Sequence, residues 1–346
     1  EPPALAAQRA PAAPPPTAGD GAGRGVPGRG GAGPGGAAPE PPGDGPAVHL
    51  FDAHVYIFRA WAVMPEMAAP DGAPTGAAYG FANTLLRYLR RRGPRFAACC
   101  FDHSFRSFRN EIFPDYKISR GEEAPPDLAP QFALCRQVAE ALGLTALEAP
   151  GYEADDVIAT LCQRLRAGGA RVVVVSSDKD LCQLVAPGVN FYDLQRDAVL
   201  DEGGVRAKFG VAPEQIPDYL GLVGDTADDL PGVPGYGRKS AAAALTAFGN
   251  IESIPAEAAA WAKAPVRGAE RLARQIAGHR AQALRIRQLA TLVREVPGLP
   301  QRRSELAWRG VNRPAWSSLC QRLGWRRIAE RAHFAPQGAG AGLARR

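Results

Sequence analysis

Residues 170–180 have the sequence ARVVVVSSDKD, in which four consecutive valines are followed by serines and two aspartates. A short apolar run bounded by polar turn residues is typical of a parallel strand that is buried on both faces. AVHLFD at 47–52 and RFAACCFD at 95–102 have the same form. Amphipathic helical patterns at 80–93, 131–143 and 155–169 end at or near glycine, as helices often do. The alternation predicts an α/β fold with a mostly parallel sheet flanked by helices.

Acidic residues follow each of these three predicted strands, and a further group of acids opens the helix at 155–169. In open α/β sheets, ligands bind outside the carboxyl ends of the strands. So many carboxylates at one edge would repel and raise one another's pKa values, and a divalent cation would resolve that conflict. Acids in a first helical turn also complement the helix dipole, which is the alternative explanation for the second group. The acids are Asp52, Asp102, Asp178, Asp180, Glu153, Asp155 and Asp156.

Residues 221–249, GLVGDTADDLPGVPGYGRKSAAAALTAFG, combine two more acids with a glycine-rich stretch. Asp225 and Asp228 are three residues apart, so on a helical turn they would share a face and could bind one ion. The glycines precede an alanine-rich helix, whose N-terminal N–H groups can hold a phosphate, and Arg238 and Lys239 add positive charge there. An ordinary flexible loop before a helix is the alternative.

The composition points to one folded region behind an unusual tail. Residues 1–47 are almost entirely Ala, Pro and Gly, so they cannot bury enough apolar surface to fold and are predicted to be disordered. These residues carry three arginines and four acids, so the remaining chain has a net charge of +7, which suggests a polyanionic partner, although surplus arginine also accompanies Ala/Arg-rich composition. The tail lacks the apolar segment of a secretory signal. Its few acids suit an organellar transit peptide, but it contains no serine.

The cysteines and the apolar pattern exclude several classes of protein. Six cysteines, at 99, 100, 135, 162, 182 and 320, show no CxxC spacing and are interpreted as small buried residues of a reducing compartment. No stretch approaches the roughly 18 apolar residues that a membrane span requires. Neither GxxxxGK(S/T) nor a strand-linked GxGxxG is present, so a nucleotide-binding protein has no support. Chloroplast, mitochondrion and bacterial cytoplasm all stay open as locations.

Six blocks in order resemble the 5′-nucleases, which include flap endonucleases and the 5′-nuclease domain of bacterial DNA polymerase I. The blocks are FDAHVYIFRAW, PTGAAYGF, FDHSFRSFRNEIFPDYKISR, YEADDVIATL, SSDKDLCQL and GDTADDLPGVPGYGRKSA, within about residues 48–295. The resemblance implies a PIN-like nuclease core at 48–200, with a helical arch at about 103–130. It further implies a helix–three-turn–helix DNA-binding region at 201–295. Residues 296–346 match nothing and are expected to form a small helical extension on the core. Because no polymerase region follows, a stand-alone nuclease is expected.

The resemblance also implies roles for individual residues. Lys117 and Arg120 would contact the scissile phosphate from the arch, with Arg109 nearby, although solvated surface cations would give the same pattern. Two positions depart from the family: Ala53 replaces the usual glycine, and Asp229 replaces an asparagine and adds charge beside a ligand. The positions of the metal-binding acids all carry carboxylates here: Asp52, Asp102, Glu153, Asp155, Asp156, Asp178, Asp180, Asp225 and Asp228. The residues of the duplex-gripping turn are Gly232, Gly235, Gly237, Arg238, Lys239 and Ser240.

The expected activity is 5′–3′ exonuclease and 5′-flap endonuclease cleavage of DNA in replication or repair. Oxygen-only ligands favour Mg²⁺, with Mn²⁺ as a substitute, and two ions roughly 4 Å apart are expected. The expected partner is DNA with a duplex and a single-stranded 5′ end or flap, bound by a monomer, and an RNA primer attached to the DNA strand is a further expected substrate. A catalytically silent DNA-binding protein and a PIN-like ribonuclease are the alternatives. The complete set of acids argues against the first, and the glycine-rich turn argues against the second.

Overall fold

The computed structural model describes residues 40–41, 45–121, 123–263 and 266–332, so most of the predicted disordered tail lies outside the described residues. Its centre is one six-stranded sheet in the order β3-β2-β1-β4-β5-β6, parallel except for β6, which pairs antiparallel with β5. The strands are β1 (Val48–Asp52), β2 (Phe96–Cys100), β3 (Thr145–Leu147), β4 (Val172–Val175), β5 (Val189–Asp193) and β6 (Ala198–Leu200).

The three strands predicted from the sequence are confirmed and are adjacent at the middle of the sheet. Val48 of β1 lies opposite Phe96 of β2 and Val172 of β4, so the three carboxyl ends meet at one edge. The other three strands, β3, β5 and β6, were not predicted from the sequence. β3 and β6 have three residues each and are only half-buried, and β5 interrupts its apolar pattern with Asn190.

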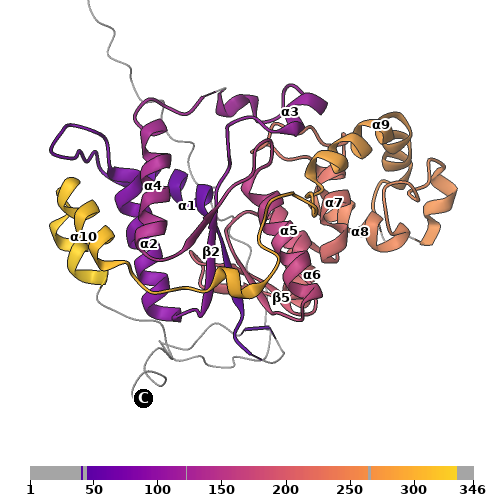
Figure 1. Ribbon diagram of the computed structural model, residues 1–346. Coiled ribbons are helices and arrows are strands. Elements are labelled where there is room, and N and C mark those ends of the chain that lie inside the picture. The colour runs from indigo at the N-terminus through magenta and orange to yellow at the C-terminus, as the bar shows by residue number, and fades with distance from the viewer. Residues whose placement is uncertain (1–39, 42–44, 122, 264–265, 333–346) are drawn as a thin grey trace, which may run out of the picture. The chain divides into compact units, whose positions relative to one another are not determined.

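Helices cover both faces of the sheet (Figure 1). One face packs against α5 (Ala154–Ala167). The same hydrophobic layer continues into α7 (Ile216–Val223), α8 (Arg238–Phe248) and α9 (Ala269–Ala290), and α7 contacts both α8 and α9. The other face packs against α1 (Ala53–Val63), α2 (Gly76–Arg92) and α4 (Ala129–Ala141). Val172 and Val174 belong to the first hydrophobic layer, whereas Val173 and Val175 belong to the second. A strand covered on both faces explains the uninterrupted valine run that identified it.

The segment expected to form a helical arch is largely irregular. Within 103–130, apart from residue 122, which is not described, only α3 (Phe108–Ile112) and a 3₁₀ turn at Ile118–Arg120 lie before α4 begins. Pro114, Gly121, Pro125 and Pro126 explain this difference, because proline and glycine interrupt helices. The expectation of helical structure therefore holds only for these two short pieces.

The part of the chain after β6 is helical. It begins with α6 (Glu202–Phe209) and continues through α7, α8 and α9 to α10 (Arg313–Arg322) and α11 (Arg326–Ala329). Trp308, Trp316 and Trp325 are buried in the same hydrophobic layer as α2 and α4, and the Trp308 indole N–H donates to the Leu142 carbonyl at 2.8 Å. The described part of the C-terminal extension thus packs on the core as expected, while residues 333–346 lie outside the described residues.

Two further predictions from the sequence concern the cysteines and membrane-spanning segments. All six cysteines are buried and free of disulfides, as the absence of paired spacing suggested. Among the described residues, no helix is long and apolar enough to cross a membrane.

Candidate metal centre and nucleic-acid interface

Hydrogen bonds join the ends of β1, β2 and β4 to one another and to the acidic turn before α5. One Asp52 carboxylate oxygen accepts from the Ser176 hydroxyl at 2.7 Å, which links the end of β1 to the end of β4. Asp102, just after β2, accepts from the Ala154 N–H at 2.7 Å, in the first turn of α5. The Asp102 N–H in turn donates to His54 Nδ1 at 3.0 Å. The Asp178 N–H also donates to the Ser176 hydroxyl at 3.0 Å, and Asp155 follows Ala154 in the first turn of α5. We refer to Asp52, Asp102 and Asp178, together with the adjacent Asp155, as the strand-end acids.

Burial and neighbouring charges raise the pKa values of two of these acids, Asp52 and Asp155. Burial and, to a smaller extent, the charges of Asp178 and Asp102 raise the pKa of Asp52 to about 7, although the Ser176 hydrogen bond opposes them. Burial also raises the pKa of Asp155 well above its ordinary range, with Asp52 and Asp178 adding to the effect. Ionisation of both Asp52 and Asp155 at neutral pH is therefore favoured by a nearby cation.

Asp180, Asp225 and Asp228 form a second group, the three-aspartate cluster. One carboxylate oxygen of each lies within 4.8 Å of the other two, and all three side chains are buried. Asp180 Oδ1 is buried and accepts no hydrogen bond, with Lys179 Nζ 3.8 Å away. Buried polar atoms are normally satisfied, and a hard divalent cation bound by the three carboxylates would satisfy this one.

The turn that carries Asp225 and Asp228 is not helical, so that expectation was wrong. Asp225 and Leu230 exchange two backbone hydrogen bonds of 2.8 Å, which close the loop as a narrow antiparallel bridge. Asp229 has φ 55°, in the left-handed region that aspartate and asparagine tolerate better than most residues, and Pro231 follows. The carboxylates still converge because the bridge folds the loop back on itself.

Asp229 itself lies outside the three-aspartate cluster. Its half-buried side chain accepts from the Ser119 N–H at 2.8 Å. The carboxylate that replaces the family's asparagine therefore bonds to the segment that carries Lys117 and Arg120.

Lys117 and Arg120 reach the acids directly. Lys117 Nζ donates to Glu153 Oε2 at 2.5 Å, and an Arg120 guanidinium N–H donates to Asp228 at 2.6 Å. The Tyr116 hydroxyl lies 3.3 Å from an oxygen of Glu153 and from one of Asp228. Although burial acts to raise the pKa of Glu153, the charges of Lys117 and Arg109 lower it to about 2. Glu153 thus lies between the strand-end acids and the cationic segment.

Arg109 and Asp156 form a buried ion pair, and Arg109 also lies 3.4 Å from Glu153. Asp156 is 0% exposed, and its two oxygens accept from the Arg109 guanidinium at 2.7 and 2.8 Å. They also accept the Glu153 and Val293 N–H groups, at 3.2 and 2.9 Å. Arg109 additionally donates to the Leu289 carbonyl at 2.8 Å. The expected ligand role of Asp156 and the expected catalytic role of Arg109 beside the arch do not fit this geometry, because neither side chain has an atom free for them.

In the glycine-rich turn before α8, some residues are exposed and some backbone groups are already hydrogen-bonded. Gly237 and Lys239 are exposed, and a Cβ at Gly237 would meet nothing within 4 Å. The Ser240 hydroxyl accepts from the Gly237 N–H at 2.9 Å, and Arg238 is exposed with a weak contact to a backbone carbonyl at 3.4 Å. The first turn of α8 therefore has an accessible surface with two cations, suited to a phosphate.

Gly232 lies against the backbone of Val223 and not at the start of α8. A Cβ there would lie 2.2 Å from the Val223 carbonyl oxygen, so glycine is needed for the close crossing of the two backbones. Gly235 has φ 86°, and the Arg271 guanidinium of α9 lies against it, 3.3 Å from where a Cβ would be. Gly232 thus supports the turn from inside, whereas Arg271 adds a cation that sequence analysis missed.

Two family models match consecutive parts of the chain. The model of the 5′-3′ exonuclease N-terminal resolvase-like domain matches residues 47–210, and that of the 5′-3′ exonuclease C-terminal SAM fold matches residues 211–314. A 5′-3′ exonuclease of Aquifex aeolicus is 37% identical over 60% of this chain and 71% of its own length. The chain belongs to the 5′-3′ exonuclease family.

Other similar proteins are longer or more distant than this exonuclease relative. DNA polymerase I of Rhizobium leguminosarum is 41% identical over 60% of this chain, and that of Bacillus caldotenax is 35% identical over 82%. The chain spans only 21% and 32% of these polymerases. Bacteriophage T5 5′-exonuclease with bound zinc ions has a TM-score of 0.57 at 19% identity, covering 70% of this chain and 89% of that one. The catalytic core of Rad2 with DNA substrate has 0.57 at 15%, covering 82% and 90%. These two likenesses confirm the fold.

Several residues of this exonuclease-family site were not identified from the sequence. Lys179 contacts Asp225, and its position between two expected ligands was the available signal. Tyr116 lies in the conspicuous DYKISR stretch. Ser107, which donates to Glu153 at 2.7 Å, and Ser176 had no local signal, because they act through residues distant in sequence.

The stability of the fold should fall as the pH rises, because buried acids such as Asp52 then lose their protons. The folded protein binds a proton at Asp52 more tightly than the unfolded chain, so protonation stabilises the fold. That contribution is complete below pH 3.8 and is lost as the pH rises through about 7. In chelator, we expect the thermal unfolding temperature (Tm) to fall between about pH 5.5 and about pH 8. Glu153, whose pKa is about 2, stays ionised in this range and does not contribute.

Added Mg²⁺ should raise Tm more at the higher pH, because carboxylates bind the ion when deprotonated. Differential scanning calorimetry with chelator or Mg²⁺ checks both effects. Asp52→Asn should flatten the decline in chelator. If Mg²⁺ raised Tm equally at about pH 5.5 and at about pH 8, the buried acids would not be its ligands.

Proposed function

We propose that this chain is a divalent-metal-dependent nuclease that cleaves DNA at 5′ ends and 5′ flaps. The observation that carries the proposal is the three-aspartate cluster, with its unsatisfied Asp180 oxygen, beside the strand-end acids. Phosphodiester hydrolysis needs little covalent participation by protein groups, so a pocket of carboxylates with cations at its rim suits it. Membership of the 5′-3′ exonuclease family supports the same activity.

The donor set fits Mg²⁺, with Mn²⁺ as a substitute. All candidate donors are carboxylate oxygens, the ligands that hard divalent ions prefer. The three-aspartate cluster would hold one ion, and Asp52, Asp155 and Asp178 would contribute to a second. Bound ions of this kind supply Lewis-acid activation of water and of the phosphodiester. Zinc ions are bound to the similar T5 5′-exonuclease, which supports a divalent-ion site here without identifying the ion.

Lys117 and Arg120 would bind and orient the scissile phosphate. Arg120 is the more accessible, with its side chain 39% exposed against 17% for Lys117. Burial opposes charging of Lys117, but Glu153 and Asp228 keep its pKa well above the ordinary value, so it stays cationic. A phosphate at the rim would exchange carboxylate contacts of these two cations for phosphate contacts. Their charge would then lie where negative charge develops during cleavage.

The turn before α8 would hold the duplex by its backbone. Gly237, Arg238, Lys239 and Ser240, with Arg271 from α9, offer backbone and cationic contacts that do not depend on base sequence. Such binding should weaken steeply with salt. A bacteriophage T5 flap endonuclease, similar at 18% identity and a TM-score of 0.56, has been solved with DNA and metal ions. We propose by analogy a 5′-flap substrate here, bound by a monomer.

A labelled 5′-flap DNA, incubated with Mg²⁺ or with chelator, tests the proposal. Wild type should release short 5′ products only with Mg²⁺. Asp178→Ala should abolish release while its affinity for the same DNA in chelator stays within about twofold, because it removes a metal donor and no duplex contact. Tight binding without cleavage in Mg²⁺ or Mn²⁺ would instead support a silent DNA-binding protein. Cleavage of single-stranded RNA but not of DNA would support a ribonuclease.

A further inference from the structure

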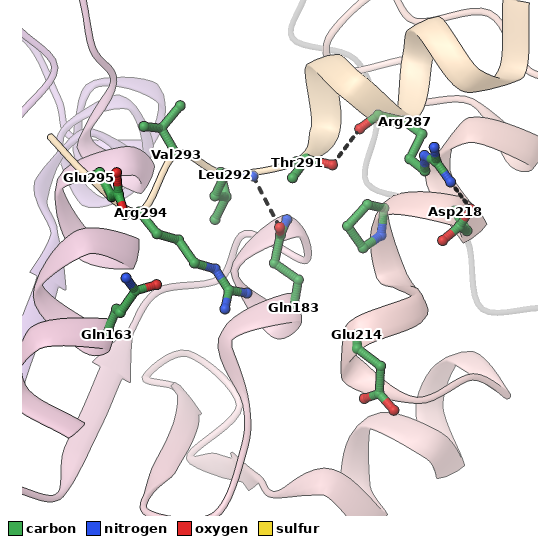
Figure 2. Close-up of a pocket in the computed structure, with 11 residues that line it drawn as sticks. Gln163, Gln183, Glu214, Asp218, Arg287, Thr291, Leu292, Val293, Arg294 and Glu295 are labelled. Carbon is green, nitrogen blue, oxygen red and sulfur yellow. Dashed lines mark hydrogen bonds and ion pairs between the residues drawn. The ribbon is translucent and has the colours of Figure 1, made fainter. Parts of the chain in front are cut away.

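A buried glutamine, Gln183, lies three residues after Asp180, in the 3₁₀ helix Asp180–Leu184. It lies on the wall of a cavity of about 580 Å³ that is also lined by Gln163 of α5, Asp218 of α7 and the segment after α9. Figure 2 shows its side chain directed at the backbone of Leu292. Gln183 is 5% exposed.

All of the polar atoms of the Gln183 side chain bond to backbone groups. Its amide nitrogen donates to the Asp180 and Ala290 carbonyls, both at 2.9 Å. Its amide oxygen accepts the Leu292 N–H at 3.1 Å. Ala290 is the last residue of α9, where carbonyls have no partner within the helix. One side chain therefore joins the backbone at Asp180 to the chain on both sides of the α9 terminus.

The other end of α9 supports the glycine-rich turn. The Tyr236 hydroxyl donates to the Leu272 carbonyl at 3.3 Å, and the Arg271 guanidinium lies against Gly235. α9 has 22 residues, which corresponds to a length of about 33 Å. A single continuous helix thus extends from the candidate duplex contact to the anchor of Asp180.

We propose that Gln183 is a positioning residue that holds Asp180 at the end of α9 and so fixes the three-aspartate cluster relative to the bound duplex. The proposal rests on the function proposed above and adds a residue that touches neither metal nor DNA. Hydrogen-bonding partners behind metal ligands fix their orientation, and losing one typically costs about 10- to 100-fold in metal affinity or activity. Gln183 acts here through the backbone of its ligand.

The test compares Gln183→Met with Gln163→Met, the same change on an exposed side chain of the same cavity. Calorimetry without DNA measures Mn²⁺ affinity, fluorescence anisotropy in chelator measures flap-DNA affinity, and steady-state cleavage measures kcat and KM. We expect Gln183→Met to weaken Mn²⁺ binding and lower kcat by about tenfold each. KM and DNA affinity in chelator should stay within about twofold, because the duplex contacts are untouched. Gln163→Met should match wild type in every measurement.

Gln183→Glu provides a second variant if Gln183→Met does not fold. It keeps the acceptor for Leu292 and removes the donors to Asp180 and Ala290, so the same losses are expected. Wild-type Mn²⁺ affinity in a folded Gln183 variant would overturn the proposal. So would a lowered unfolding temperature accompanied by equal losses of Mn²⁺ and DNA binding, which indicates a structural role only. If wild type does not cleave DNA, the proposed function fails, while the Mn²⁺ titration still decides the role of Gln183.

Discussion

Asp180→Asn should lower kcat for flap cleavage about 1,000-fold, which corresponds to about 4 kcal/mol of transition-state stabilisation. The change removes a carboxylate from the three-aspartate cluster and leaves an amide that cannot balance a divalent charge. The same variant should unfold at a higher temperature than wild type in chelator. Burial and the neighbouring acids raise the pKa of Asp180 well above its ordinary range, so its charged form is unfavourable without a cation.

Steady-state cleavage in Mg²⁺ and thermal unfolding in chelator check the two opposite effects. Asp71→Asn, the same change at an exposed site remote from the cluster, should alter neither kcat nor the unfolding temperature. If Asp180→Asn retained kcat within tenfold of wild type, the cluster would not be the catalytic metal site. A destabilised variant in chelator would show that the Asp180 carboxylate is already compensated by protein groups.

The second large effect concerns stability. Arg109→Gln should cost about 3–5 kcal/mol in the free energy of unfolding, because it leaves Asp156 buried without its countercharge. Asp156 has no solvent exposure, and Arg109 supplies both of its ionic hydrogen bonds. The Leu289 carbonyl would also lose its donor. Urea unfolding of wild type and variant, in chelator, measures the difference.

The exposed pair Arg91 and Asp197 provides a matched control, because its side chains are 41% and 47% exposed. Arg91→Gln should cost no more than about 1 kcal/mol, as surface ion pairs usually do. Combining Arg109→Gln with Asp156→Asn should recover part of the loss, since no unpaired charge then stays buried. Equal costs for the two single arginine variants would rule out Arg109 as the essential partner of Asp156.

Local sequence pattern was sufficient for the fold class and for the broad location of the site. The valine run at 172–175 required a strand covered on both faces, and strands of this kind pair in parallel with their carboxyl ends together. The acids at Asp52, Asp102 and Asp178 had to meet at one sheet edge as a result. These predictions depend on neighbouring residues and on general topology, so no long-range contact was needed to make them.

Tertiary structure alone decided which acids face the candidate metal site. Asp155 and Asp156 are adjacent first-turn acids with the same local signal, yet only Asp156 meets Arg109, 47 residues earlier in the chain. Gln183 likewise has no distinguishing sequence context, because its partners at Ala290 and Leu292 are more than 100 residues away. A carboxylate in a first helical turn can cap the helix, bind a metal or pair with a cation. Only the groups that folding brings against it determine which of these it does, because burial makes the nearest charge decisive.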